Sequence, residues 1–186
     1  SRTNRKLGLL GVKKASAISK ASKEVWQSKH NSEFPLDVFQ TGSGTSSNMN
    51  ANEVIANLAS RFSGIEVDPN DDVNMSQSSN DVIPTAIKIS AYKDLTEKLY
   101  PALDKLIKEI EKKESSLKGI VKTGRTHLMD AMPLDISQEF SAWSSQLKNV
   151  KKTLVFLEKR LLEMPLGGTA VGTGINAHPC LLYTSD

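Results

Sequence analysis

Cysteine is almost absent from these 186 residues. Cys180 is the only one, so the chain cannot form an internal disulfide framework, which fits a reducing compartment. Histidine is also scarce, and His30, His127 and His178 lie too far apart for a metal-ligand cluster at helical spacing. We therefore expect no metal site.

Long apolar runs and strong charge are missing as well. No apolar run approaches the ~20 residues of a membrane span. Residues 1–7 lack the apolar core of a signal peptide, while a transit peptide upstream is left open. The net charge is only +3, from 24 basic and 21 acidic residues spread along the chain, which does not indicate a nucleic-acid-binding protein. We expect a cytoplasmic protein, with a mitochondrial location left open, that binds neither membranes nor nucleic acids.

Helical periodicity dominates what is present. Apolar residues spaced three or four apart predict helices over 13–30 and 48–62. They also predict two long helices, over about 81–117 and about 135–165. Pro84 and Pro101 interrupt the first of these, so we expect an N-terminal turn at one and a kink at the other. Asp135 and Gln138 have the spacing of a capping box at the start of the second.

The two long helices determine the expected fold class. Helices of this length are too long for a small domain, and a bundle usually contains at least four. Their partner helices must therefore come from sequence outside these residues or from other subunits. We predict a mainly α protein with a small N-terminal domain over 1–77 and the first part of a long-helix bundle over 78–179.

Four polar segments do not fit a packing explanation: 42–50, 74–81, 123–130 and 167–176. Each is rich in small hydroxyl and amide side chains, and three lie next to a predicted helix start. Backbone N–H groups at a helix N-terminus, together with neutral hydroxyl and amide donors, suit the binding of a carboxylate. A dinucleotide site at Gly42-Ser-Gly44 is disfavoured, because Ser47 stands where a third glycine is needed and no βαβ unit surrounds it.

Taken together and in order, these segments resemble class II fumarase. The stretches are TGSGTSSNMNANEVIAN at 41–57, NMSQSSNDVIPT at 74–85, GRTHLMDAMPL at 124–134 and LGGTAVGTGINAHP at 166–179. Aspartases of the same superfamily typically carry Gln where His127 stands, and Gly-Ala-Thr-Ala where residues 167–170 are Gly-Gly-Thr-Ala. These two features favour a fumarase, and they leave aspartate ammonia-lyase or another superfamily lyase as the alternative.

The resemblance implies a fumarase/aspartase-like fold and an activity. A class II fumarase is a lyase of the tricarboxylic acid cycle that reversibly hydrates fumarate to L-malate without a cofactor. It is a homotetramer that builds each site from three subunits. Carried onto this chain, the resemblance makes His127 and Thr126 catalytic, with Thr126 also contacting substrate. The other residues expected to bind the dicarboxylate are Ser43, Gly44, Thr45, Ser78, Ser79 and Asn80.

Two departures from the family pattern qualify that expectation. The serine-base loop, Gly-Ser-Ser-x-Met-Pro-x-Lys-x-Asn, does not occur in this sequence. We therefore expect no hydratase activity from these residues alone. The family's second carboxylate site, at Arg-x-x-His-Pro-Asn-Asp, is degenerate here: Pro69, Asn70 and Asp71 remain, but Ile65 and Asp68 replace the cationic residues.

Residues 180–186 do not continue the family pattern and look like a foreign tail.

A non-catalytic helical fragment that only oligomerises is the rival from a different functional class. The four polar segments favour descent from an enzyme over this rival.

Overall fold

The structure is a computed structural model that describes residues 1–37, 39, 40 and 42–182, without the side chains of 181 and 182. The chain forms two compact units. Unit 1 comprises Ser1–Ile87 and Met164–Asp186, and unit 2 comprises Lys88–Glu163. Most described residues are helical, which confirms the predicted mainly α class. The domain boundary between residues 77 and 78, and the foreign nature of 180–186, stay predictions.

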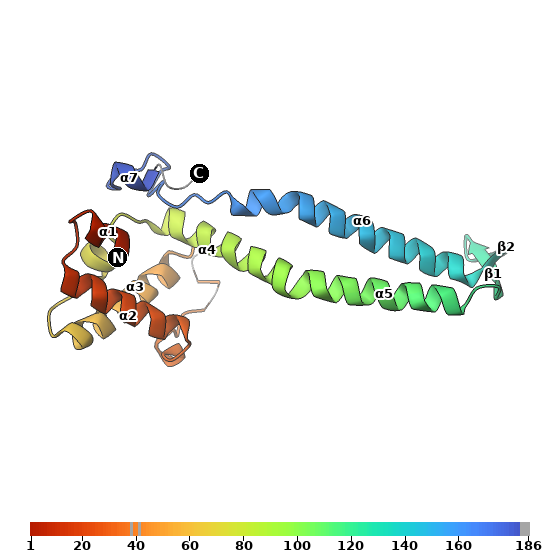
Figure 1. Cartoon of the computed structure of the whole chain (residues 1–186), viewed down its shortest axis with the longest axis horizontal. Helices are drawn as coiled ribbons and strands as arrows, with labels where there is room; N and C mark the ends of the chain where they lie inside the picture. The colour runs from red at the N-terminus through yellow and green to blue at the C-terminus, as the bar shows by residue number, and fades with distance from the viewer. Residues whose placement is uncertain (38, 41, 183–186) are drawn as a thin grey trace. The chain divides into compact units, whose positions relative to one another are not determined.

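Unit 1 is a set of helices packed around a core of small side chains. Helices α2 and α3 lie side by side in it (Figure 1). Alanines dominate their contact and permit a close approach of the two backbones: Ala15, Ala17 and Ala21 come from α2, and Ala56 and Ala59 from α3. The elements are α1 (Arg2–Lys6), α2 (Val12–Trp26), the 3₁₀ turn η1 (Asn31–Glu33), α3 (Thr45–Ser63), the π turn η2 (Pro69–Val73), the start of α4 (Ser79–Asp94) and α7 (Pro179–Leu182).

Helix α2 ends at Trp26, four residues before the predicted end at His30. The reason is local, because Ser28 adopts a left-handed backbone conformation with φ 59°, which an α-helix cannot include. The His30 ring instead folds back to the Glu24 carboxylate, with Nε2 and Oε2 3.1 Å apart. Helix α3 begins at Thr45, three residues before the predicted start.

Unit 2 is a pair of long helices joined by a β-hairpin. Helix α5 (Tyr100–Ser116) and α6 (Ile136–Leu162) run antiparallel along each other, and the hairpin of β1 (Val121–Thr126) and β2 (Met129–Asp135) connects them (Figure 1). Ion pairs cross the helix pair, with Lys148 Nζ 2.5 Å from Glu111 Oε1 and Lys151 Nζ 2.5 Å from Asp104 Oδ1. The hairpin was not predicted from the sequence.

The first long helix differs in detail from its prediction. It begins at Ser79 rather than Asp81 and includes Pro84 in its interior. Its hydrogen-bond pattern changes to π over η3 (Leu95–Leu99), directly before α5. Pro101 lies in the first turn of α5. Because proline has no N–H, the α-helical bond from residue 101 to residue 97 cannot form, so the pattern departs from α where the kink was expected.

The start of α6 confirms the predicted capping box. Asp135 Oδ1 accepts a hydrogen bond from Ser137 N at 2.8 Å, and Gln138 Oε1 accepts one from Asp135 N at 3.2 Å. The apolar seam of α6 faces α5 only in part. Trp143, Val150 and Leu157 remain 45%, 51% and 42% exposed, so the described residues leave an apolar face of unit 2 uncovered.

Candidate functional site

Two helix N-termini meet in unit 1, and both carry residues that the sequence singled out. Helix α3 starts after Gly44, whose φ is 72°. Buried Asn48, in the first turn of α3, donates from Nδ2 to Ser79 Oγ at 3.0 Å at the start of α4. A Cβ on Gly44 would lie 2.8 Å from Ile83 Cγ2 of α4. The 42–50 and 74–81 segments therefore lie together although ~30 residues separate them.

The side chains at this junction are neutral hydrogen-bonding groups. The hydroxyls of Ser43 and Thr45 are 3.1 Å apart and exposed. Ser78 Oγ accepts a hydrogen bond from Asn80 N at 3.2 Å. Two helix N-termini present partial positive charge, and hydroxyl and amide donors add hydrogen bonds without adding a competing base. This arrangement suits a carboxylate ligand.

The glycine-rich segment 167–176 packs against the same helix start. Asn80 Nδ2 donates to Ala170 O at 2.7 Å. The turn folds on itself, because Gly172 N and Gly174 N both donate to Gly168 O at 3.0 Å. Three of the four polar segments thus come together in unit 1.

Asp81 joins these segments, and sequence reasoning assigned it no role. Its side chain is 1% exposed. Oδ1 accepts from Ser78 N at 2.9 Å, while Oδ2 accepts from Gly167 N at 3.1 Å and Thr169 N at 2.9 Å. The spacing Ser78-x-x-Asp81 is a capping-box signal that could have indicated the first of these bonds. The other two join residues more than 80 positions apart, and no local pattern indicates them.

The fourth polar segment forms the tip of the hairpin in unit 2. Thr126 pairs with Met129, which leaves His127 and Leu128 as a two-residue turn. Their φ angles are 50° and 62°, as in a type I′ turn, which usually requires Asn or Gly at both positions. Neither position is Asn or Gly in this chain, so the left-handed conformation of His127 and Leu128 is strained. Backbone strain of this kind is often found at functional sites.

The predicted site residues therefore belong to two units. Ser43, Gly44, Thr45, Ser78, Ser79 and Asn80 lie in unit 1, and the structure brings them together. Thr126 and His127 lie in unit 2, where both are exposed. Within the part of the chain that the structure describes, the His127 ring makes no hydrogen bond.

The segment that was predicted to be a degenerate second site contains its own carboxylate. Asp68 Oδ1 accepts hydrogen bonds from Asn70 N at 2.7 Å and Asp71 N at 2.8 Å. These two bonds lower the pKa of Asp68 below its ordinary value because they favour the charged form. The N–H groups of this turn are thus already paired with an internal anion. A free carboxylate would have to displace it, which supports the prediction that the site is degenerate.

We predict that an Asp68→Asn variant is less stable than the parent at pH 7, and that the difference closes in acid. Asn keeps an acceptor oxygen but loses the charge. The folded pKa of Asp68 is lowered, so its stabilisation is present above the unfolded pKa of ~3.9. It is lost as pH falls through the folded pKa. Urea unfolding from pH 7 to about pH 2 measures the difference. A difference that stays constant or widens in acid would contradict this assignment.

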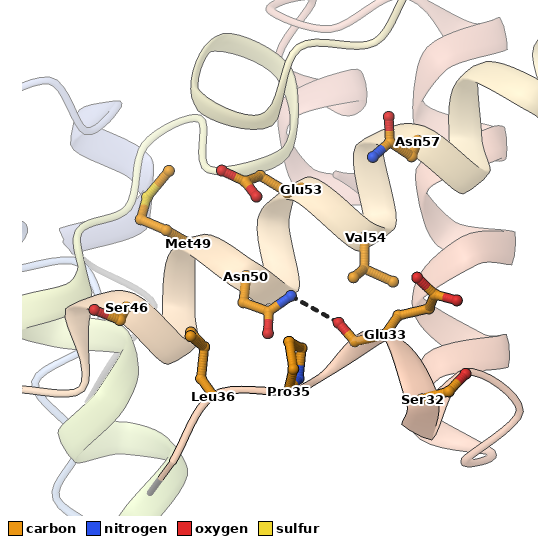
Figure 2. A pocket seen from close by; sticks show the side chains of 10 residues that line it. All are labelled: Ser32, Glu33, Pro35, Leu36, Ser46, Met49, Asn50, Glu53, Val54 and Asn57. Carbon is orange, nitrogen blue, oxygen red and sulfur yellow. Dashed lines mark hydrogen bonds between the residues drawn. The ribbon is translucent and has the colours of Figure 1, made fainter. Parts of the chain in front are cut away.

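A separate pocket of unit 1 is a poor host for a dicarboxylate. Figure 2 shows it between α3 and the segment that carries Glu33 and Pro35, with a volume of about 550 Å³. Asn50 Nδ2 donates across it to Glu33 O at 2.9 Å. The exposed carboxylates of Glu33 and Glu53 line it, and both would repel an anionic ligand. The junction of α3 and α4 is therefore the better candidate site.

Neither a metal-binding cluster nor a membrane-spanning helix is found among the described residues. No group of three or more His, Cys, Asp or Glu side chains there has an arrangement that could hold a metal ion. No helix there is long and apolar enough to cross a membrane.

Comparison with known proteins decides the family. A family model described as Lyase matches residues 1–183. This chain belongs to the Lyase family. Within the Lyase family it is 54% identical, over 96% of its length, to the class II fumarate hydratase of Xylella fastidiosa. It is 47% identical over 96% of its length to that of Saccharolobus solfataricus.

The fold of this Lyase family member agrees with a solved relative. The crystal structure of recombinant class II fumarase from Schistosoma mansoni matches 96% of the chain with a TM-score of 0.89 and 41% identity. The resemblance to class II fumarase and the fumarase-like fold are thereby confirmed. The chain covers 38% of the Xylella fastidiosa protein, 41% of the Saccharolobus solfataricus protein and 39% of the Schistosoma mansoni chain. It thus spans about two fifths of the length of these relatives.

Proposed function

We propose that this chain supplies part of the active site of a fumarate hydratase, a lyase that reversibly hydrates fumarate to L-malate. The observation that carries the proposal is the meeting of the α3 and α4 N-termini, where Asn48 Nδ2 lies 3.0 Å from Ser79 Oγ. The neutral donors gathered there suit a dicarboxylate. The identity of 54% to a class II fumarate hydratase supports the choice of fumarate.

Each polar group has a part in the proposed reaction. Donors of the α3 and α4 starts hold the substrate carboxylates and orient the attacking water: Ser43, Gly44, Thr45, Ser78, Ser79 and Asn80. Thr126 contacts the substrate beside the water. His127, as a neutral imidazole, accepts a proton from water while the oxygen bonds to one alkene carbon. The electron pair moves onto the distal carboxylate as an aci-carboxylate, which the hydrogen-bond donors stabilise.

The second proton transfer lies outside these residues. Adding a proton to the other carbon completes malate, and the reverse reaction needs a base to remove it. The family assigns that step to a serine in a Gly-Ser-Ser-x-Met-Pro-x-Lys-x-Asn loop, and this sequence contains no such pattern. We propose that these residues alone do not turn over fumarate and that no cofactor takes part.

The proposed working form is a homotetramer in the cytoplasm. Helix α6 exposes Trp143, Val150 and Leu157, and an uncovered apolar stripe of this kind favours helix–helix assembly. In this proposal, Thr126 and His127 of one copy meet the α3 and α4 starts of another. The candidate residues are divided between two units of the chain. This division is expected if each active site is shared among subunits.

A complementation assay tests the proposed reaction against the alternatives. The chain is mixed with a complementing segment, namely the part of the Xylella fastidiosa fumarate hydratase that follows the region matched here. Assembly is checked by size-exclusion chromatography. The mixture is then assayed for fumarate formation from L-malate and for ammonia release from L-aspartate. We expect fumarate from malate and no ammonia.

Two results would contradict the proposal. Faster turnover of aspartate than of malate would identify an aspartate ammonia-lyase instead. An assembled mixture that converts neither substrate would favour the non-catalytic oligomerisation fragment.

A further inference from the structure

Asp81 is an unusual residue for a protein interior, because it is only 1% exposed and no cation is paired with its carboxylate among the described residues. Burying an unpaired charge is costly unless hydrogen bonds compensate it. Three backbone N–H groups do so: Ser78 N at Oδ1, and Gly167 N and Thr169 N at Oδ2. This carboxylate is the polar link between the start of α4 and the glycine-rich turn.

The turn that Asp81 holds is strained. Thr169 has φ 57°, which is an outlier for a β-branched residue and costs roughly 1–3 kcal/mol. Its side chain is 6% exposed, and its hydroxyl has no hydrogen-bond partner among the described residues. Gly168 leaves little room for a side chain, because a Cβ would lie 3.2 Å from both Gly172 Cα and Pro165 O. Such a turn persists only where its surroundings hold it.

The strained turn also fixes a proposed substrate-binding side chain. Asn80 Nδ2 donates to Ala170 O at 2.7 Å, one residue after Thr169. The orientation of the Asn80 amide therefore depends on where the turn lies, and Asp81 Oδ2 sets that position. On the other side of the same carboxylate, Oδ1 holds Ser78 N at the start of α4.

We propose that Asp81 is a positioning residue for the dicarboxylate site, because it locks the 167–170 turn onto α4 and so aligns Asn80. This inference rests on the proposed function for its catalytic consequence. The structural part, that Asp81 holds the turn, is independent of the substrate. Asp81 touches neither substrate nor water in this role.

Hydrogen exchange of the chain itself tests the structural part. The amides of Gly167 and Thr169 should be protected in the parent chain, in contrast to that of exposed Val171. Asp81→Asn keeps the shape of the side chain but loses the charge and one acceptor. We expect exchange of both amides to accelerate by at least about tenfold, which corresponds to ~1.4 kcal/mol.

Asp72→Asn is the matched control. Asp72 is also a buried carboxylate of unit 1, 7% exposed, and it pairs with Lys14 Nζ at 2.5 Å. Its loss should destabilise the chain without accelerating exchange at Gly167 and Thr169 relative to the rest of unit 1. Unprotected amides at both positions in the parent would overturn the proposal without any variant. So would equal acceleration in the two variants.

Kinetics in the complemented mixture test the catalytic part. We expect Asp81→Asn to lower kcat/KM for fumarate by at least about tenfold, and Asp72→Asn to leave it within about twofold of the parent. Parent-like kcat/KM in Asp81→Asn would overturn the positioning role. A parent mixture without turnover would count against the proposed function, and the exchange comparison would still decide whether Asp81 holds the turn.

Discussion

Replacing His127 with asparagine is expected to lower kcat for fumarate hydration by about 10²- to 10⁴-fold in the complemented mixture, the usual contribution of a general base. Asparagine cannot accept the proton of water near neutral pH. It does tolerate a left-handed backbone, so it suits position 127, where φ is 50°. The hairpin should fold at least as well as in the parent. The loss would thus be one of chemistry, measured as initial rates of fumarate absorbance change at saturating substrate.

The matched control is Leu128→Asn in the same turn. Leu128 has φ 62° and is 98% exposed, and it has no role in the proposed reaction. Its replacement should relieve strain in the hairpin and leave kcat within about twofold of the parent. A similar loss of kcat in both variants would show that the turn, and not the imidazole, carries the effect.

A Gly44→Ala variant is expected to disrupt the junction of α3 and α4. A left-handed φ of 72° costs alanine about 1–2 kcal/mol. The added Cβ would also lie 2.8 Å from Ile83 Cγ2, so either Ile83 or the 43–45 loop must move. We expect a loss of at least ~1 kcal/mol in urea unfolding of the chain. We also expect KM for fumarate in the mixture to rise about tenfold or more, because Thr45 and Ser79 no longer align.

Gly42→Ala provides the comparison for Gly44. Nothing lies within 4 Å of a Cβ built at Gly42, and its φ is not left-handed. This variant should match the parent in both stability and KM. Equal effects of the two substitutions would mean that general loop stiffness matters, and that the close approach to Ile83 does not.

Regular helices were predictable from the sequence where apolar residues repeat without interruption. Helix α6 is the clearest example, because its apolar residues keep a spacing of three and four and Asp135 and Gln138 mark its start. The C-terminal end of α2 was less well predicted. The left-handed residue that follows it is Ser28, and not the glycine that commonly marks the end of a helix. The π turn before Pro101 was indicated only as a kink.

The hairpin in unit 2 could not be read from local signals. Strand β1 contains Gly124, and β2 contains Pro133, and both residues are depleted in strands. The turn has His127 and Leu128 where Asn-Gly would have signalled a hairpin. Gly124 is explained only by the fold, because a Cβ there would lie 2.6 Å from Met132 O of the partner strand.

The candidate site was predictable in its residue types but not in its connections. Neutral donors next to helix starts indicated a carboxylate ligand, and the structure gathers Ser43 to Thr45 with Ser78 to Asn80. The role of Asp81 depends on bonds to Gly167 N and Thr169 N, and only the folded chain brings these groups together. Thr126 and His127 lie in unit 2, whereas the other candidate residues lie in unit 1.

We propose that these residues provide the carboxylate- and water-binding side of a fumarate hydratase, and that the second proton-transfer group lies outside them. The most direct test is the rate of fumarate absorbance loss with the chain alone, the complementing segment alone, and the two together. We expect turnover in the mixture only. Steady fumarate loss by the chain alone, abolished by His127→Asn, would contradict it.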